Sequence, residues 1–372
     1  MSKELVHTPE GVRDVYGRES YERSTVKHKI KEIMYRYGYE NILTPTFEFY
    51  DVFAKEISQA SARDLYKVFD NEGNTLVLRP DFTPSVARCI AKYFMEDNDP
   101  VRICYSGNIF INTHRLQGKL REHTQMGAEL MCDGSVKADA EMIAMMIESI
   151  RATGLTDFKI TIGDVDYFKG IVEEAGIDED TENQIRQYLA GRNYSALEEY
   201  LHQLVTDGRI DSKYADVLVH MPDFTTADEL EEGAADIVSR RARSSIERLK
   251  NLYHLLDVYG VSGNVYFDLA MLSEYNYYTG VMFRAYTYGV GDAIAKGGRY
   301  DNLLSKFGKD APAIGYMVDL EYIMSALYSQ NIPISYSQEP DVVTYSDSDY
   351  ESKLAMVQSK RAQGYYIVLK HE

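Results

Sequence analysis

The chain has 372 residues, of which 45% are hydrophobic and 26% are charged. This composition is ordinary for a globular protein and excludes disorder over the whole chain, because disordered chains have low hydrophobicity. The formal net charge of −18 argues against a nucleic-acid binder, which normally carries a basic stripe that displaces counterions from phosphate.

The cysteines and the apolar segments indicate the cellular compartment in which the protein is expected. The three cysteines are well separated and form no C-x-x-C motif, so neither a thiol redox motif nor a zinc site is indicated. The first 20 residues are polar and charged, unlike a signal peptide. No segment approaches the roughly 18–20 apolar residues of a membrane span. The sequence therefore predicts a cytoplasmic protein that does not enter a membrane.

The first third of the chain alternates between helical and strand patterns. Residues 18–37 place their apolar side chains mostly on one helical face, and Gly38 is a natural stop. In residues 39–48, Pro45 predicts an edge strand or a strand end. Residues 65–70 and 75–79 flank a turn-forming Asn-Glu-Gly-Asn sequence and predict a hairpin.

The strands that follow predict the fold class. Residues 102–110 and 125–131 predict a strand pair, joined by a polar, basic loop over 111–124. A helix is expected over 136–153, and further strands are expected at 158–162, 265–270 and 281–288. Turns or loops link most strands, without regular βα repeats. This pattern favours an α+β fold with an antiparallel sheet flanked by helices.

Composition shifts divide the chain into three parts. Residues 168–256 are helical, charged and almost without strand pattern, which predicts a helical insertion between two parts of a core, 1–167 and 257–332. A Pro- and Ser-bearing linker at 333–340 leads to a strand–helix–strand pattern. This small α/β unit, 340–372, is too short for an independent core. Either a third domain is truncated there, or the unit docks on something else.

Common catalytic motifs are missing from the sequence. There is no phosphate-binding G-x-x-x-x-G-K-[ST] loop, no G-x-S-x-G elbow and no metal-ligand spacing among the histidines. Instead, polar groups cluster in three stretches, at 78–84, at 125–129 and at 277–280 with 295–301. In a strand, Gln125, Gly127 and Glu129 share one face, and the glycine leaves space for a small-molecule pocket. Taken singly, each stretch is more easily explained by surface polar residues around a glycine bulge.

In their order along the chain, these stretches resemble the motifs of histidyl-tRNA synthetase, a class II aminoacyl-tRNA synthetase. The resemblance covers nearly all of residues 8–328 and rests on Thr-Pro-Glu-Gly-Val-Arg-Asp at 8–14, Ile-Leu-Thr-Pro at 42–45, Arg-Pro-Asp at 79–81, Gln-x-Gly-x-Glu at 125–129, Tyr-Tyr at 277–278 and Gly-Gly-Arg-Tyr-Asp at 297–301. It implies a class II synthetase-like sheet flanked by helices.

The resemblance also implies a histidine pocket. The positions that match the histidine-binding residues of the synthetase are Asp81, Thr83, Gln125, Glu129, Tyr278 and Tyr300. The Asp81 carboxylate would bind the α-ammonium group, and Glu129 with the two phenols would bind both imidazole nitrogens. Arg121 or backbone N–H groups could bind the ligand's carboxylate.

Departures from the synthetase pattern imply that amino-acid activation is lost. Ile111 stands where the family carries an arginine after the Phe of its second class motif, and the nearby Glu is Thr113. The family's catalytic arginine is replaced by Ser273, and the final arginine of the third class motif by Tyr322. Fixed guanidinium groups stabilise the charge that develops at the α-phosphate of ATP, and losing one such group typically costs on the order of 10²–10³ in rate.

Other motifs look more like the regulatory subunits of ATP phosphoribosyltransferase, namely those at 108–110, 118–125, 277–281 and 291–295. The chain also ends inside the region that matches the synthetase's anticodon-binding domain. This resemblance implies a non-catalytic subunit with no catalytic residues, no cofactor, no metal and no bound tRNA. It would form a homodimer around residues 42–45 and assemble with the short-form catalytic subunit of ATP phosphoribosyltransferase into a hetero-oligomer. That complex catalyses the first step of histidine biosynthesis, and free L-histidine would act as its feedback effector.

Three alternatives remain at this point. The chain could be an active histidyl-tRNA synthetase with substituted chemistry. It could be a histidine-activating enzyme that acts on something other than tRNA, although the missing arginines count against both enzymes. It could also be a synthetase-like binding module that serves an unrelated partner.

Overall fold

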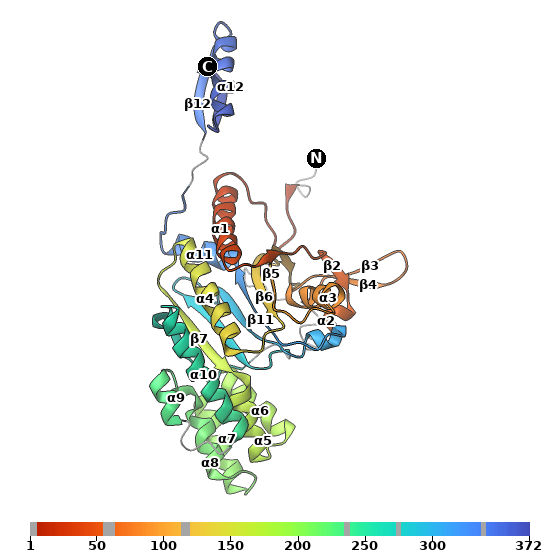
Figure 1. The fold of residues 1–372 in the computed structure, drawn as a ribbon, viewed down its shortest axis with the longest axis vertical. Helices are drawn as coiled ribbons and strands as arrows, with labels where there is room; N and C mark the ends of the chain where they lie inside the picture. The colour runs from red at the N-terminus through yellow and green to blue at the C-terminus, as the bar shows by residue number, and fades with distance from the viewer. Residues whose placement is uncertain (1–5, 55–63, 113–119, 234–238, 273–276, 336–339) are drawn as a thin grey trace.

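The computed structural model describes residues 6–54, 64–112, 120–233, 239–272, 277–335 and 340–372. Its centre is an eight-stranded sheet (Figure 1). In spatial order the strands are β1 (Glu40–Asn41), β5 (Val101–Phe110), β6 (Glu122–Met131), β11 (Ala313–Asp319), β10 (Ala295–Arg299), β9 (Val281–Thr287), β7 (Phe158–Asp164) and β8 (Val265–Phe267).

The six central strands, from β5 to β7, pair antiparallel, as the sequence predicts. The two edge strands differ, because β1 pairs parallel with β5 and β8 pairs parallel with β7. Strand β8 is also shorter than the predicted 265–270. The chain turns after Phe267, where the Asp268 carboxylate accepts a hydrogen bond from the Ala270 N–H group and the Asp268 carbonyl accepts one from Met271.

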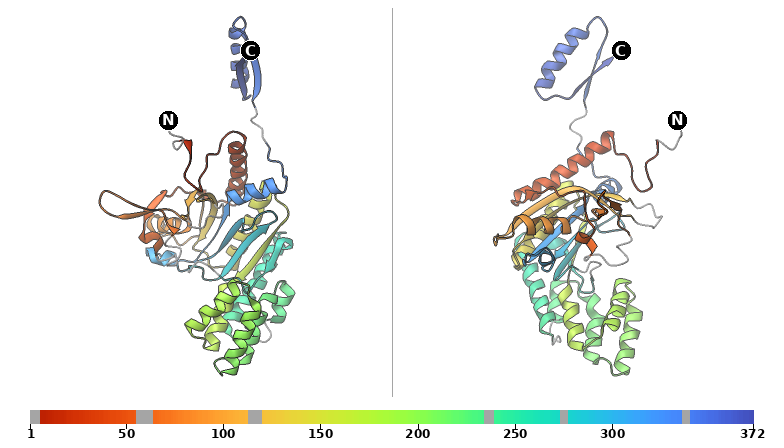
Figure 2. Two further views of the ribbon diagram at one scale, coloured as in Figure 1. Left: turned by 180° about the vertical axis from the view of Figure 1, so that it is seen from behind. Right: turned by 90° about the vertical axis from the view of Figure 1, so that its right-hand side faces the viewer.

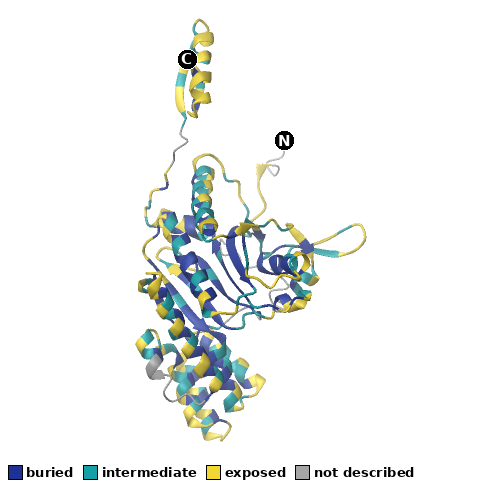
Figure 3. Cartoon of the chain, in the orientation of Figure 1, coloured by how far each residue is buried: buried dark blue, intermediate teal, exposed yellow. Residues whose placement is uncertain are grey.

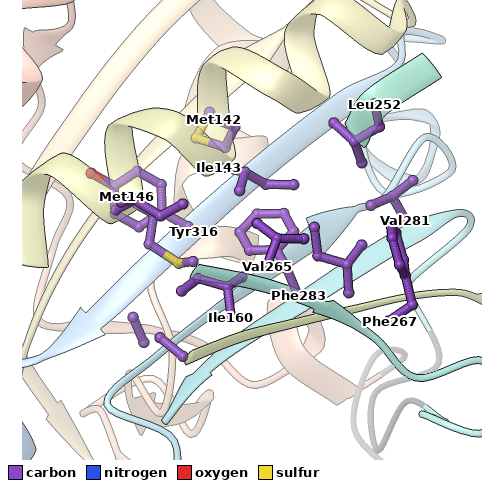
Figure 4. Packing of buried hydrophobic residues seen from close by; sticks show 14 of the residues in the cluster. Met142, Ile143, Met146, Ile160, Leu252, Val265, Phe267, Val281, Phe283 and Tyr316 are labelled. Carbon is purple, nitrogen blue, oxygen red and sulfur yellow. The ribbon is translucent and has the colours of Figure 1, made fainter. Parts of the chain in front are cut away.

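Three helices cover one face of this sheet (Figure 2): α1 (Gly17–Arg36), α4 (Val136–Thr153) and α11 (Leu320–Ser329). The bounds of α4 are those predicted, because the Ser135 hydroxyl caps its first turn and Gly154 ends it in the left-handed conformation. Met142, Ile143 and Met146 of α4 pack on the sheet around Phe283 and Tyr316 (Figure 4). This packing forms the main core, and it leaves the opposite face of the sheet for other contacts.

The opposite face carries α3 (Thr83–Tyr93) and a second, smaller core in which Val86 and Ile90 pack near Tyr105 and Tyr300. Next to it lies a three-stranded sheet of β2 (Phe47–Phe49), β4 (Thr75–Leu78) and β3 (Lys67–Phe69), in which β3 and β4 form the predicted hairpin. The short helix α2 (Asp51–Ala54) follows β2. The 3₁₀ turns that lie wholly within the described ranges are η3 (Met221–Asp223), η4 (Ser262–Asn264) and η5 (Leu304–Phe307).

Six helices form the lower part of the molecule in Figure 1. They are α5 (Val165–Ala175), α6 (Glu179–Ala190), α7 (Tyr194–Thr206), α8 (Ser212–His220), α9 (Ala227–Gly233) and α10 (Arg240–Val258). The first begins three residues before the expected boundary of the insertion, because the Asp164 carboxylate caps it by accepting from the Asp166 N–H group. Among the described helices, none combines the length and the apolar character needed to cross a membrane.

The last unit comprises β12 (Asp341–Tyr345), α12 (Tyr350–Ala362) and β13 (Ile367–His371), and its two strands pair in parallel. It extends from the rest of the chain at the top of Figure 1. Within residues 340–372, all of which are described, two apolar side chains are buried, Val357 and Ile367. Most of the unit's surface is accordingly exposed (Figure 3).

Candidate ligand-binding site

A cavity of about 470 Å³ lies over the face of the sheet that α1, α4 and α11 leave uncovered. Strands β6, β10 and β11 contribute to its floor, and residues 80–83 and 277–278 contribute to its walls. The structure brings six of the predicted histidine-binding residues together in its lining: Asp81, Thr83, Gln125, Glu129, Tyr278 and Tyr300.

Glu129 of β6 is the buried acid at the centre of this lining, with 1% of its surface exposed. Its Oε1 accepts hydrogen bonds from the Thr83 hydroxyl at 2.9 Å and from the Tyr105 phenol at 3.2 Å, and its Oε2 accepts one from the Tyr300 phenol. Burial raises the pKa of Glu129 to about 8, although the hydrogen bond from Tyr300 opposes the shift. A ligand that brings an N–H donor would stabilise the ionised carboxylate.

Two glycines make room for this cluster. Gly315 of β11 is paired with Glu129, and a Cβ at position 315 would lie 1.5 Å from Glu129 Oε2. Gly127 lies between the two polar residues of β6, as the sequence indicates, but the space above it is not open. The phenol of Tyr105, from the neighbouring strand β5, fills that space. Tyr105 therefore belongs to the site, although the sequence analysis did not predict it. The pattern that could have indicated it is an aromatic residue paired with a glycine on the neighbouring strand.

A second polar group surrounds Asp81. The Gln125 side-chain amide donates to Asp81 Oδ1 at 3.1 Å, and the Tyr277 phenol donates to Oδ2 at 3.4 Å. The Gln125 Oε1 atom is buried and accepts no hydrogen bond within the described residues. A carboxylate beside an unsatisfied carbonyl oxygen is suited to bind an ammonium group, because a buried acceptor without a donor is unfavourable.

Arg121 does not join the other six residues. Its backbone N–H group bonds the Gly11 carbonyl, and its side chain packs against Gly11, where an added Cβ would lie 2.7 Å from Arg121 Cγ. Its guanidinium lies 4.0 Å from the Glu10 carboxylate. The structure thus directs Arg121 toward the N-terminal segment, and the cavity's described lining holds no arginine.

The far end of the cavity holds a histidine between two hydrogen-bond acceptors. His123 Nδ1 lies 2.7 Å from Asp319 Oδ2, and Nε2 lies 3.0 Å from the Leu120 carbonyl oxygen. Both neighbours are acceptors, an arrangement that favours a ring with protons on both nitrogens. Burial alone would lower the pKa of His123, but the hydrogen bond and the charge of Asp319 raise it above its ordinary value. The Tyr322 ring packs edge-on against this imidazolium, with 5.7 Å between ring centroids.

The charges of the described lining favour a cationic ligand group. Five acids face two bases, His123 and Lys296; the acids are Asp64, Asp81, Glu129, Asp292 and Asp319. Of the positions where the synthetase carries an arginine, Ile111 and Tyr322 line the cavity. Thr113 and Ser273 lie outside the described residues.

Comparison with known proteins places this fold in a class. Residues 11–323 match the family model for histidyl-tRNA synthetase. The structure superimposes on the histidyl-tRNA synthetase from Nostoc sp. PCC 7120 with a TM-score of 0.81, at 21% identity over 99% of this chain and 86% of the other. The chain is therefore a member of the histidyl-tRNA synthetase-like class, with the class II synthetase fold.

The more similar relatives define the family within that class. The ATP phosphoribosyltransferase regulatory subunits of Acetivibrio thermocellus and Clostridium acetobutylicum are 34% and 35% identical, over 98% and 96% of this chain and 86% and 88% of theirs. An ATP phosphoribosyltransferase regulatory subunit/histidyl-tRNA synthetase from Bacillus halodurans superimposes with a TM-score of 0.88, at 30% identity, over 99% of this chain and 93% of the other. The chain belongs to the family of ATP phosphoribosyltransferase regulatory subunits.

Proposed function

We propose that this chain is a non-catalytic subunit that binds and activates a short-form catalytic subunit of ATP phosphoribosyltransferase. The complex would catalyse the first step of histidine biosynthesis, and free L-histidine in the cavity around Glu129 would inhibit it. One observation carries the proposal: the cavity holds partners for the imidazole ring and the α-ammonium group of histidine, while its described lining has no arginine to hold a triphosphate.

Two polar groups of histidine, the imidazole ring and the α-ammonium group, would have counterparts in the cavity. The imidazole nitrogens would contact Glu129, Tyr278 and Tyr300, and the α-ammonium group would contact Asp81 and the unsatisfied Gln125 Oε1. Buried polar groups discriminate strongly against ligands that leave them unpaired. The same lining opposes ATP, because its ionised carboxyl groups repel the negative charges of a triphosphate.

Feedback inhibition requires that histidine bind two states of the complex with different affinity. Tyr300 connects the cavity to the helices. Its phenol bonds Glu129, and the preceding residue, Arg299, is part of an ion-pair network. Arg299 contacts Asp139 of α4, and Asp139 also pairs with Arg248 of α10. Histidine binding could in this way alter how the helices α5–α10 pack on the core.

The proposed homodimer is supported by an exposed apolar face on the small sheet. Phe47 and Phe49 of β2 point to the same side as their cross-strand partners Leu78 and Leu76. Phe49 is 57% exposed, and the nearby Leu43 is 83% exposed. A second copy of the chain would bury this face. If sedimentation shows the Phe49→Asp variant to be as dimeric as the unmodified chain, the dimer uses another surface.

The decisive experiment is a calorimetric titration of the chain with L-histidine, with Glu129→Ala as the test and Glu199→Ala, an exposed acid on α7, as the control. We expect saturable binding that weakens at least about tenfold in Glu129→Ala, because charge-assisted hydrogen bonds contribute about 1.5–3 kcal/mol. In the assembled complex, histidine should inhibit the Glu199→Ala form at the concentration that inhibits the complex with the unmodified chain. The Glu129→Ala form should require a higher histidine concentration. Unchanged inhibition in Glu129→Ala would place the effector elsewhere, and histidine-dependent pyrophosphate exchange would indicate an active synthetase.

A further inference from the structure

A second cavity, of about 200 Å³, lies where the helices α6 and α7 approach the sheet. Thr161 of β7 and Arg284 of β9 are cross-strand partners on its floor. They share the sheet face that carries the first cavity, and Arg284 is paired on its other side with Lys296, which lines that cavity. The loop residues Asp268–Leu272 form one wall, and none of the described lining residues is common to both cavities.

The lining of this second cavity is basic, although the protein as a whole is acidic. Three guanidinium groups, those of Arg186, Arg192 and Arg284, face one carboxyl group, that of Asp268. The Asp268 carboxylate already accepts a hydrogen bond from the Ala270 N–H group. Burial raises the pKa of Asp268 above its ordinary value, although the charges of Arg192 and Arg284 oppose the shift. The cavity therefore holds an excess of positive charge.

The most specific evidence for a binding site in this cavity comes from Arg192. It follows the last turn of α6 with a φ of 51°, in the left-handed region that favours glycine. Gly191, directly before it, has an ordinary φ of −79°. The strained position is thus occupied by an arginine although a glycine is its neighbour. Within the described residues the Arg192 guanidinium makes no hydrogen bond or ion pair, in contrast to Arg186, which pairs with Glu182. Strain of this kind is often found at binding sites.

We propose that this second cavity binds a small oxyanion of the phosphate class, either free phosphate or the phosphate group of a small ester. Guanidinium groups bind phosphate oxygens through paired hydrogen bonds, and three residues that carry hydroxyl groups, Thr161, Tyr194 and Tyr286, also line the cavity. The volume is below the roughly 300–1,000 Å³ of pockets for drug-sized ligands, so a whole nucleotide does not fit. The proposal is independent of the role of the first cavity.

One wall of the second cavity is close in sequence to a residue that contacts the first cavity. Residues 268–272 line the second cavity, and five residues beyond Leu272 the chain reaches Tyr277, whose phenol bonds Asp81 in the first. An anion held by Arg192 and Arg284 would fix this wall in one position.

The test is a calorimetric titration of the full chain with inorganic phosphate and, separately, with glycerol 3-phosphate, at constant ionic strength. Arg192→Gly removes the guanidinium and relieves the backbone, so the thermal stability of the free chain should not fall. We expect phosphate to bind the unmodified chain saturably and Arg192→Gly at least about tenfold more weakly. Arg36→Ala, which removes an exposed arginine at the end of α1, is the control and should bind as the unmodified chain does. Tighter binding of glycerol 3-phosphate would identify an ester as the ligand.

Two results would overturn the proposal. One is equal phosphate affinity in the unmodified chain and in Arg192→Gly, or no saturable binding by the unmodified chain. The other is loss of phosphate binding in Glu129→Ala, which would place the anion in the first cavity. If Arg192→Gly does not fold, Arg192→Lys replaces it, because a lysine keeps the charge but cannot form the paired hydrogen bonds. An affinity unchanged in Arg192→Lys would then count against the guanidinium's role.

Discussion

The phenol of Tyr105 on β5 lies directly over Gly127 on β6, where a Cβ would come within 2.4 Å of the phenol oxygen. From this position Tyr105 donates to Glu129, two residues along β6. Its ring also stacks on Phe82 with 4.4 Å between ring centroids. One glycine thus allows a side chain from the neighbouring strand to support the acid at the centre of the cavity.

We therefore predict that Gly127→Ala displaces Tyr105 and weakens histidine binding. Overpacking of a buried site typically costs about 1–3 kcal/mol, so the free energy of unfolding should fall by about that amount. Urea unfolding and histidine calorimetry on the same preparations measure the two effects. Gly291→Ala is the matched control, because a Cβ there meets no atom within 4 Å. If the two variants bind histidine equally well, Tyr105 does not support the site.

The raised pKa of Glu129 predicts a pH dependence of stability. In the folded chain the pKa is about 8, against an ordinary value of 4.5, so the folded state holds a proton that the unfolded state releases between these values. Stability from this group is complete below pH 4.5 and is lost as the pH rises to about 8. Between pH 5 and pH 9 the unmodified chain should lose on the order of a few kcal/mol relative to Glu129→Gln. Urea unfolding of both proteins across this range gives the difference, and parallel stability curves would contradict the shift.

The elements that were predicted well are those with local signals. Residues 136–153 form α4 with the expected bounds, because a serine cap and a terminal glycine mark both ends. The parallel pairing of β1 with β5 has no such signal, since the two strands are about 60 residues apart and the pairing depends on packing of the whole sheet. The same holds for β8, where the Asp268 turn ends the strand earlier than the hydrophobic pattern indicates.

The candidate site also contains both residues that the sequence predicts and residues that it does not. The residues taken from the family motifs lie together, but Tyr105, Tyr277 and His123 were not predicted as members. Tyr105 enters through the register of two strands, and His123 is held by Asp319 from the far end of β11. Such contacts join residues up to 196 positions apart. No pattern within one segment of the sequence specifies them.

The ion pairs between Asp139, Arg299 and Arg248 predict unequal effects of removing either arginine. Asp139 is fully buried and Arg299 is 3% exposed, whereas the Arg248 side chain is 28% exposed. Arg299→Ala leaves the buried Asp139 carboxylate with the partly exposed Arg248 as its arginine partner, so we expect a loss of about 3–5 kcal/mol in the free energy of unfolding. Arg248→Ala leaves Asp139 paired with Arg299 and should cost clearly less. Urea unfolding of both variants decides the order, and an equal loss would show that the exposed arginine is as important as the buried one.

The contact between His123 and Asp319 predicts a second pH dependence. Because the pKa of His123 is raised above 6.5 in the folded chain, its contribution to stability is complete below pH 6.5 and is lost as the pH rises through the folded value. Protonated His123 also bonds the Leu120 carbonyl, so deprotonation should release residue 120 from this end of the cavity. Proton NMR of the imidazole rings, with His123→Gln to identify the resonance among eight histidines, measures the pKa directly. A value at or below 6.5 would mean that the ring is neutral and that one of its two contacts is not a hydrogen bond.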